Sequence, residues 1–393
     1  MAAYLLKYQV ICSLDTSLSP APAACSYPST MASTVLVLDV TVEPSNLEEG
    51  LYGILNHVRE GWNKDDIIFK KMPSFFSSNQ NTVCRTSDDM AGAVMIRVCC
   101  GQGDTQQELA ATQLLHEILA SPRLICTFKN GVCHEFVQGN SCNWNDISAF
   151  KDVNIAKAVA REVAKIHSEQ ALHLALNKYG IKDHVVPFGY LFGMLQNWST
   201  NTGNSEIDAM LSSHFPSADV LQKEIEGLMK MVTDEGIATV FGHNDANPTN
   251  VIYNPAQGVA TLVDYEVCGM SPETYDLASF LESSATGMYP DVDARRHSPD
   301  FQKEFLKEYI KTKRILEGSG DDITEKDVEK LYILTTKTVL IVYLISAMAF
   351  VTIGANPMPG SGIAGKDLIG LGITRYMWYQ TNKEEILALK VPE

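Results

Sequence analysis

Four residues in the second half of the chain have the types and the spacing needed for chemistry on a phosphate group. His243, Asp245 and Asn250 form the pattern His-x-Asp-x-x-x-x-Asn, and Asp264 follows Asn250 by fourteen positions. An aspartate within such a pattern can accept the proton of an attacking hydroxyl group. The asparagine carbonyl and the later carboxylate are oxygen ligands of the kind that Mg²⁺ prefers. We therefore predict phosphoryl transfer in which Asp245 is the catalytic base, while Asn250 and Asp264 bind the metal.

The segments around these residues must bring them together, and their sequences predict how. Thr239–Gly242 has the pattern of a short strand that leads into the loop. The apolar runs 251–253 and 258–263 are joined by the turn-forming sequence Asn-Pro-Ala-Gln. A hairpin of these two runs would fix the separation of the two metal ligands. We expect His243 to be structural and to hold the loop through hydrogen bonds to the backbone.

The first half of the chain has the element order of a small, mainly β nucleotide-binding lobe. β-Branched runs predict strands, apolar periodicity predicts helices, and an Asn-Gly pair predicts a hairpin turn. In chain order the predicted elements are a helix at 47–58, strands at 67–72, 82–85 and 93–100, a helix at 104–119, and a hairpin of 124–127 with 131–137.

After residue 138 the sequence pattern becomes mainly helical. We predict an α+β fold with two lobes, like that of protein kinases. The nucleotide-binding lobe would span 34–138, and a larger helical lobe at 139–393 would carry the catalytic loop and the metal and substrate sites. Residues 1–33, rich in Ser, Pro and Ala, are expected to form a flexible extension.

Composition narrows the classes of protein further. The chain has 393 residues, 45% hydrophobic residues and 20% charged residues, as in ordinary globular proteins. A formal net charge of −16 argues against a nucleic-acid partner, because phosphate backbones are bound by clustered Lys and Arg. The nine cysteines include no CxxC pair, which favours reduced, buried thiols in the cytoplasm over a zinc site or disulfides.

One apolar run, 338–355, has two interpretations. Its eighteen residues carry no charge, which is near the lower limit for a membrane span. A helix buried on all sides in a large helical lobe has the same composition. Lys337 and Asn356 bracket the run closely, and Ser346, Thr352 and Gly354 reduce its apolarity. We therefore favour a buried helix and expect no transmembrane segment.

Longer motifs resemble the choline/ethanolamine kinase family, whose fold is shared with protein kinases and aminoglycoside phosphotransferases. The resemblance covers about residues 45–380 and is specific at the segment LICTFKNGVCHEFVQG (124–139), at FGHND (241–245), at NVIYN (250–254) and at VDYE (263–266). The hairpin sequence and the Tyr-Asn pair after Asn250 are closer to ethanolamine kinases than to choline kinases. The resemblance implies a two-lobed kinase that uses ATP and Mg²⁺.

Residue by residue, the resemblance gives roles to further positions. Arg97 would contact the nucleotide phosphates, and Glu108, in the next helix, would pair with it. The hinge between the lobes would bind adenine through its backbone at Glu135 to Val137. Only Asn81 is kept from the phosphate loop, where Ser78-Asn-Gln-Asn81 replaces the Gly-x-Thr-Asn of the family. Losing that glycine would loosen the phosphate clamp, because glycine lets backbone amides approach phosphates closely. We also expect Asp276 to tie the loop to the helical lobe.

The acceptor site departs from the family more strongly. The candidate substrate carboxylates are Asp245, Glu266 and Glu282, but Glu282 follows Asp276 by six residues where the family has seven. One residue turns a helix by about 100°. The tryptophan pair of the family is absent from 346–350. A quaternary ammonium needs an aromatic cage, whereas a primary ammonium can bind carboxylates and carbonyls. Ethanolamine is therefore favoured over choline.

The resulting prediction is an ethanolamine kinase-like enzyme that makes phosphoethanolamine for phosphatidylethanolamine synthesis. The open alternatives are a choline kinase, a kinase of another small alcohol, and a catalytically degenerate binding protein of the same fold. The sequence leaves open whether the chain forms a homodimer.

Overall fold

The computed structural model describes most of the chain after residue 34. The described residues are 35–72, 80–86, 90, 92–99, 105–118, 120, 122–141, 148–181, 185–320, 322–355 and 365–392. The predicted extension at 1–33 and positions 78 and 79 of the phosphate loop lie outside them.

A six-stranded sheet forms the first part of the fold, and the sequence patterns predict five of its strands. The strands are β1 (Leu36–Leu38), β2 (Ile68–Lys71), β3 (Gln80–Arg85), β4 (Val94–Val98), β5 (Leu124–Phe128) and β6 (Gly131–Glu135). Their order in the sheet is β1-β5-β6-β4-β3-β2, and only the β1–β5 pair is parallel. The sequence does not predict β1, because three residues are too few to show a period.

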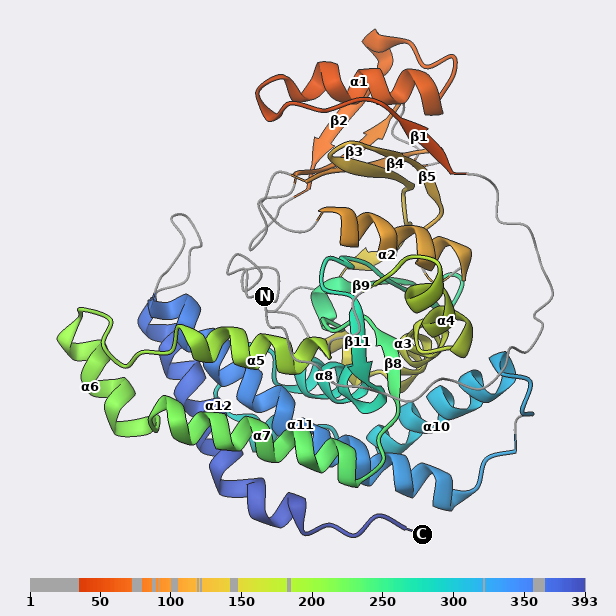
Figure 1. The fold of residues 1–393 in the computed structure, drawn as a ribbon. Coiled ribbons are helices and arrows are strands. Elements are labelled where there is room, and N and C mark those ends of the chain that lie inside the picture. Colours follow the sequence, from red (N-terminus) through yellow and green to blue (C-terminus); the bar gives the residue numbers. More distant parts are fainter. Residues whose placement is uncertain are drawn as a thin grey trace.

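Two helices flank this sheet. Helix α1 (Leu47–Val58) has the predicted bounds and covers one face of the sheet (Figure 1). Its Leu51, Ile54 and Leu55 are buried in one cluster with the apolar side chains of β3 to β6. Helix α2 (Thr105–Glu117) lies between the sheet and the helical part (Figure 1). Helix α1 therefore covers the sheet, and helix α2 joins the sheet to the helical part.

The second part of the fold is mainly helical, so the predicted α+β class is confirmed. Its helices are α3 (Val153–Ile166), α4 (Glu169–Asn177), α5 (Val186–Gln196), α6 (Ser205–His214), α7 (Ala218–Asp234), α8 (Glu273–Thr286), α9 (Val292–Arg295), α10 (Pro299–Leu316), α11 (Glu325–Ala355) and α12 (Gly365–Leu387). Pro216 lies between α6 and α7, where a proline prevents one continuous helix. The lobe boundary after residue 138 stays a prediction.

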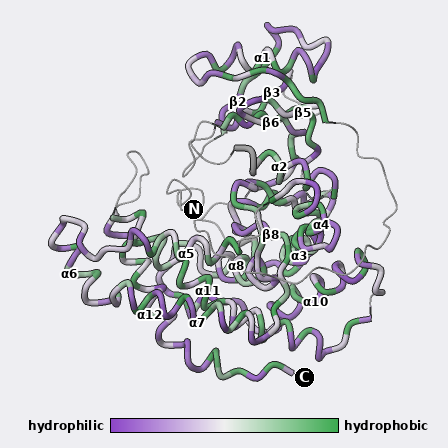
Figure 2. Tube along the Cα trace, viewed as in Figure 1, coloured by the Kyte–Doolittle hydropathy of each residue, from purple (hydrophilic) through white to green (hydrophobic). Residues whose placement is uncertain are grey.

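Helix α11 contains the apolar run for which two interpretations were open. Within the described chain it is the one helix long and apolar enough to cross a membrane. In the fold, 72% of its most apolar window is buried, and the helix packs against α12, α8 and α5. By contrast, hydrophobic and hydrophilic residues alternate along α10, which has one buried and one exposed face (Figure 2). The packing of α11 supports the prediction of a core helix.

Five short strands support the predicted catalytic loop. They are β7 (Asn140–Ser141), β8 (Thr239–Gly242), β9 (Val251–Asn254), β10 (Val259–Leu262) and β11 (Gly269–Pro272). β8 has the predicted bounds and pairs with β11, while β9 and β10 form the predicted hairpin. The loop at 243–250 therefore leaves one sheet and enters another, and both of its ends are fixed.

Candidate active site

One buried carboxylate, that of Asp276 in α8, holds the start of the loop. Its Oδ2 accepts a hydrogen bond from the backbone N–H of His243 (2.6 Å), and its Oδ1 accepts one from that of Asn244 (2.8 Å). His167 Nε2 lies 3.0 Å from the same carboxylate. Burial by itself would raise the pKa of Asp276, but the hydrogen bonds from the His167 side chain and from the His243 backbone lower it overall. The predicted anchoring role of Asp276 is confirmed.

The backbone at the start of the loop is unusual in two ways. A Cβ on Gly242 would lie 2.8 Å from Ser271 Cβ and 3.1 Å from Asp276 Oδ2, so only glycine fits there without displacing the anchor. Asn244 has a φ of 62°, in the left-handed region that few residues other than glycine adopt. Its side-chain Nδ2 donates to the carbonyls of residues 242, 267 and 269, which compensates for the strained backbone. With this conformation the chain turns away from the direction of β8 just before Asp245.

His243 connects the loop to the segment that carries Asp264. Its Nδ1 accepts a hydrogen bond from the backbone N–H of Asp245 (3.2 Å), and its Nε2 lies 3.1 Å from the carbonyl oxygen of Val263. Both contacts suit a neutral ring with the proton on Nε2. The predicted hydrogen bonds of His243 to the backbone are confirmed.

The hairpin of β9 and β10 brings the two predicted metal ligands together. The backbone N–H of Val263 donates to the carbonyl of Asn250 (2.9 Å), so Asn250 lies opposite the residue that precedes Asp264. The Asn250 Nδ2 donates to the backbone oxygen (2.9 Å) and to Oδ2 (3.0 Å) of Asp245. The amide nitrogen of Asn250 thus orients the predicted base.

Arg97, on β4, links the sheet to this loop. Its Nη1 lies 2.8 Å from Asp264 Oδ1, and its Nη2 lies 3.0 Å from Glu266 Oε2. Burial alone would raise the pKa of Asp264, but the Arg97 guanidinium lowers it overall. The side chain of Glu108, the predicted partner of Arg97, lies outside the described residues. In the described structure, Arg97 therefore pairs with two carboxylates of the loop segment.

The other predicted nucleotide residues lie along the same sheet. Asn81 on β3 is the register partner of Arg97 on β4. At the end of β6, the backbone N–H of Glu135 donates to the carbonyl of Arg123 (2.9 Å), and the N–H of the next residue donates to the carbonyl of residue 93 (3.1 Å). The backbone N–H groups of these two hinge residues are thus already hydrogen-bonded within the lobe. Val137 follows them directly, where the chain leaves the sheet.

An opening beside the loop brings together Asp245 and Glu282. It is lined by Asp245 and Asn247 from the loop, by Glu282 from α8, by Tyr343 and Phe350 from α11, and by Arg375 from α12. The one-residue offset of Glu282 thus does not turn it away from the acceptor side. Glu266, the other predicted substrate carboxylate, is not among the residues that line this opening. Glu266 lies instead at the sheet side, bound to Arg97.

Glu282 is already bound by other side chains. Arg296 Nε and Nη2 donate to Glu282 Oε1 at 3.0 and 2.8 Å, and the Tyr343 hydroxyl donates to Oε2 at 2.7 Å. The Tyr343 ring stacks on Trp378, with ring centroids 4.1 Å apart. A carboxylate has about four lone-pair sites, so Glu282 can accept a further donor. Its negative charge, however, is largely balanced.

The sequence patterns do not predict Arg296, Tyr343 or Arg375 as residues of this region. One signal could have found Arg375. It is the single charged residue between Leu368 and Tyr379, in a segment whose other residues are apolar or uncharged. A lone charge in an apolar helix indicates either an internal ion pair or a functional site.

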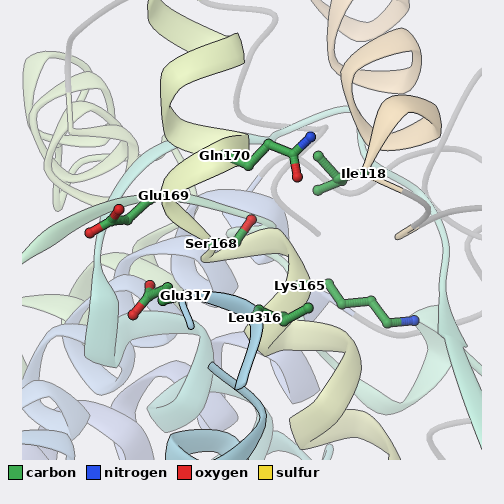
Figure 3. A pocket seen from close by; sticks show the side chains of 7 residues that line it. All are labelled: Ile118, Lys165, Ser168, Glu169, Gln170, Leu316 and Glu317. Atoms are coloured by element: carbon green, nitrogen blue, oxygen red, sulfur yellow. The ribbon is translucent and has the colours of Figure 1, made fainter. Parts of the chain in front are cut away.

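A second, shallow opening lies between the start of α4 and the end of α10 (Figure 3). Glu169 and Glu317 lie one above the other at the same side of it, and Lys165 extends away from both (Figure 3). Lys165 pairs instead with Glu162 (2.7 Å). None of the predicted site residues lines this opening.

The donor set at the loop fits Mg²⁺. No group of three or more His, Cys, Asp or Glu residues suited to a metal occurs within the described ranges. Asn250 and Asp264 nevertheless offer side-chain oxygens at the two ends of one hairpin. Mg²⁺ commonly takes one or two protein oxygens and fills its remaining positions with water and substrate phosphates. The residues present are therefore sufficient for a nucleotide-bound Mg²⁺ ion.

Comparison with known proteins places the chain in a family. The family model described as choline/ethanolamine kinase matches residues 74–379. Ethanolamine kinase 1 of Mus musculus is 27% identical over 370 residues, which cover 91% of this chain and 96% of that protein. Ethanolamine kinase 2 of Homo sapiens is 24% identical over 380 residues, which cover 95% and 91%.

Solved structures agree on the fold. An ethanolamine kinase of Plasmodium vivax superposes with a TM-score of 0.65 at 16% identity, over 88% of this chain and 91% of that one. A choline kinase of Cryptosporidium parvum superposes with a TM-score of 0.62 at 17% identity, over 86% and 95%. The chain belongs to the choline/ethanolamine kinase family of small-molecule phosphotransferases.

Proposed function

We propose that the protein transfers the γ-phosphoryl group of ATP, with Mg²⁺, to the hydroxyl group of a small amino alcohol, and that ethanolamine is the first acceptor to test. One observation carries the proposal: Asp245, Asn250 and Asp264 are held together by the hairpin and by Asp276, directly beneath Arg97. Phosphoryl transfer needs this combination of a proton acceptor, oxygen ligands and a cation. The cytoplasmic location expected from the cysteines is part of the same proposal.

The residues divide the work in the following way. Asp245 accepts the proton as the acceptor oxygen bonds to the γ-phosphorus, while the bond to the oxygen bridging to the β-phosphate breaks and ADP leaves. Asn250 keeps the Asp245 carboxylate oriented through its Nδ2. Arg97 faces the phosphates, and the Val137 amide faces the adenine. When bound, Mg²⁺ at Asn250 and Asp264 neutralises phosphate charge.

The acceptor side supports a primary ammonium better than a quaternary one. A quaternary ammonium is recognised by several open aromatic faces. Tyr343 and Phe350 are the aromatic side chains that line the opening, and the Tyr343 ring is already stacked on Trp378. The curated relatives reported above are ethanolamine kinases, which agrees with this chemistry.

The test is phosphotransfer from labelled ATP to ethanolamine and to choline, for the wild-type chain and for Asp245→Asn. We expect the substitution to lower kcat by about 100- to 10,000-fold, because it removes the proton acceptor. Nucleotide affinity, measured by calorimetry with ATP and Mg²⁺, should change little. Asp219→Asn, which alters an exposed aspartate on α7, is the matched control and should retain full activity.

Undiminished transfer by Asp245→Asn would refute the assigned base. Failure of the wild-type chain to bind ATP with Mg²⁺ would instead favour the binding-protein alternative. A clear preference for choline, or for an alcohol without an amine, would contradict the choice of ethanolamine.

A further inference from the structure

A chain of hydrogen-bonded side chains lies behind the catalytic loop and has no part in the phosphoryl transfer described above. It runs from His167, which directly follows helix α3, to Tyr309 on α10. His167 Nε2 lies 3.0 Å from Asp276 Oδ2, and His167 Nδ1 lies 2.9 Å from the Tyr309 hydroxyl. All three side chains are almost completely buried. The imidazole ring is therefore held from both sides, between the anchor of the loop and a second helix.

The chain of contacts continues from Tyr309 toward the surface. The Tyr309 hydroxyl donates to Glu273 Oε1 (3.0 Å), and Lys313 Nζ donates to the same oxygen (2.5 Å). Lys313 lies one turn after Tyr309 on α10, and Glu273 is the first residue of α8, the helix that carries Asp276. Burial alone would raise the pKa of Glu273, but the charge of Lys313 lowers it overall. Glu273 is thus kept as a carboxylate, which fixes the position of the Tyr309 hydroxyl.

A second group of a tyrosine, a glutamate and a lysine shows what is particular to the first. Tyr379 on α12 donates to Glu224 Oε2 (2.6 Å), and Lys383, one turn later, donates to the same oxygen (2.7 Å). Tyr379 is as buried as Tyr309, since each is 1% exposed. Within the described ranges, however, the Tyr379 hydroxyl contacts neither a histidine nor the catalytic loop. The contact with His167 is therefore what distinguishes Tyr309.

Asp276 connects the position of His167 to that of the catalytic base. Its two oxygens accept hydrogen bonds from the backbone N–H groups of His243 and Asn244, which directly precede Asp245. A rotated carboxylate would lose these bonds, because each oxygen serves a different amide. The contact of His167 with Oδ2 opposes such a rotation. Misplacing a catalytic group by about 1 Å can lower a rate by about 100-fold, so a small displacement here matters.

We infer that Tyr309 is a positioning residue for phosphoryl transfer. It orients the base Asp245 through the pair of His167 and Asp276. This inference rests on the proposed function and adds a residue that is not among those lining the acceptor opening. Loss of the Tyr309 hydroxyl should therefore slow the transfer without weakening the binding of either substrate. A purely structural tyrosine would instead lower the stability of the fold and leave kcat per folded molecule unchanged.

The experiment compares Tyr309→Phe with Tyr379→Phe, because each variant removes one buried hydroxyl that donates to a lysine-bound glutamate. Steady-state kinetics use ATP, Mg²⁺ and the acceptor that the wild-type chain uses best. We expect kcat to be about 10-fold lower for Tyr309→Phe, the effect of about one lost hydrogen bond. The KM for each substrate should change by no more than about 2-fold. Tyr379→Phe should keep the wild-type kcat, and urea denaturation of both variants shows that the assays measure folded protein.

A double variant tests whether the two residues act as one chain. His167→Gln removes the ring that joins Tyr309 to Asp276, and it should lower kcat by about 10-fold or more. Adding Tyr309→Phe to it should lower kcat by no more than about 2-fold further, because the effects of residues in one hydrogen-bond network are not additive. Independent residues would instead multiply their separate effects.

Hydrogen exchange of the loop gives a readout that does not need turnover. The amide protons of His243 and Asn244 are bound to Asp276. In Tyr309→Phe they should exchange about 10-fold faster than in the wild type, because the anchor is held less firmly. In Tyr379→Phe they should exchange at the wild-type rate.

Each outcome decides the inference. An unchanged kcat in Tyr309→Phe, or an equal loss in Tyr379→Phe, overturns it and leaves the proposed function intact. Multiplied effects in the double variant overturn the connection through His167. If the wild-type chain phosphorylates no acceptor, the proposed function fails and the inference fails with it. If Tyr309→Phe does not fold, the comparison of His167→Gln with Tyr379→Phe decides by the same kinetic criteria.

Discussion

The sheet side of the site and the acceptor opening meet at Asp245, but their carboxylates are paired with arginine in different ways. On the sheet side, the guanidinium of Arg97 is shared between two carboxylates, those of Asp264 and Glu266. In the opening, Arg296 pairs with Glu282, and Arg375 donates to the backbone carbonyls of Gly287 and Tyr289. The carboxylates of the sheet side thus share one guanidinium, whereas Glu282 in the opening has the guanidinium of Arg296 to itself.

The two sides also differ in how the chain builds them. Asp245, Asn250 and Asp264 lie within one loop and one hairpin, so local structure sets their spacing. The opening combines side chains from α8, α11 and α12, which are far apart in sequence. A local motif can stay unchanged while residues on distant helices are substituted one at a time. This difference explains why the catalytic loop follows the family pattern and the acceptor side departs from it.

The largest expected effect comes from the anchor that both sides share. Asp276→Asn replaces an acceptor oxygen by an NH₂ group that faces the backbone donors of His243 and Asn244. We expect the free energy of unfolding to fall by about 3–5 kcal/mol, as for other broken buried charge networks. Urea denaturation measures this. A loss below 1 kcal/mol would show that the loop does not depend on Asp276.

The next effect should be confined to the sheet side. Arg97→Met leaves Asp264 and Glu266 without their cation. We expect kcat/KM for ATP to fall by about 100-fold, since two charge-assisted hydrogen bonds are lost. The KM for the acceptor should change by no more than about 2-fold. Steady-state kinetics with each substrate varied in turn measures both KM values. A rise in the KM for the acceptor as well as in that for ATP would show that Arg97 does not act on the nucleotide side alone.

A smaller effect should be confined to the opening. Glu282→Gln leaves Arg296 without its carboxylate and weakens the site for the ammonium. We expect the KM for the acceptor to rise by about 10-fold while the KM for ATP stays the same, because one charge-assisted hydrogen bond is lost. Glu329→Gln, which alters a more exposed glutamate paired with Lys303, is the control. A change in the KM for ATP would mean that the two sides are not independent.

The smallest effect concerns pH. The pKa of Asp276 is lowered in the folded state, so the unfolded state binds its proton first as the pH falls. The stabilisation by Asp276 is therefore fully present above its ordinary pKa of 3.8 and is lost as the pH falls through the lowered folded-state value. The stability difference between wild type and Asp276→Asn should thus stay constant from pH 7 to about 5 and shrink below about 4. Denaturation at several pH values checks this.

The sequence predicts long and strongly patterned elements well. The bounds of α1 and of β8 agree with prediction, and the ends of β9 and β10 differ by one residue. It does not predict β1, α4, α5 or α9. α9 is a single turn, and α5 is apolar on most of its surface, so neither shows a clear helical period.

For the site, too, local features were predictable from the sequence and contacts between distant elements were not. The types and spacing of His243, Asp245, Asn250 and Asp264 were determined by the sequence, because hydrogen bonds within one loop and one hairpin fix their geometry. The pairing of Arg97 with Glu266, and the placement of Arg375 beside Asp245, were decided by the tertiary structure. Such contacts join elements more than 100 residues apart, and only the packing of helices and sheet determines which distant charges meet.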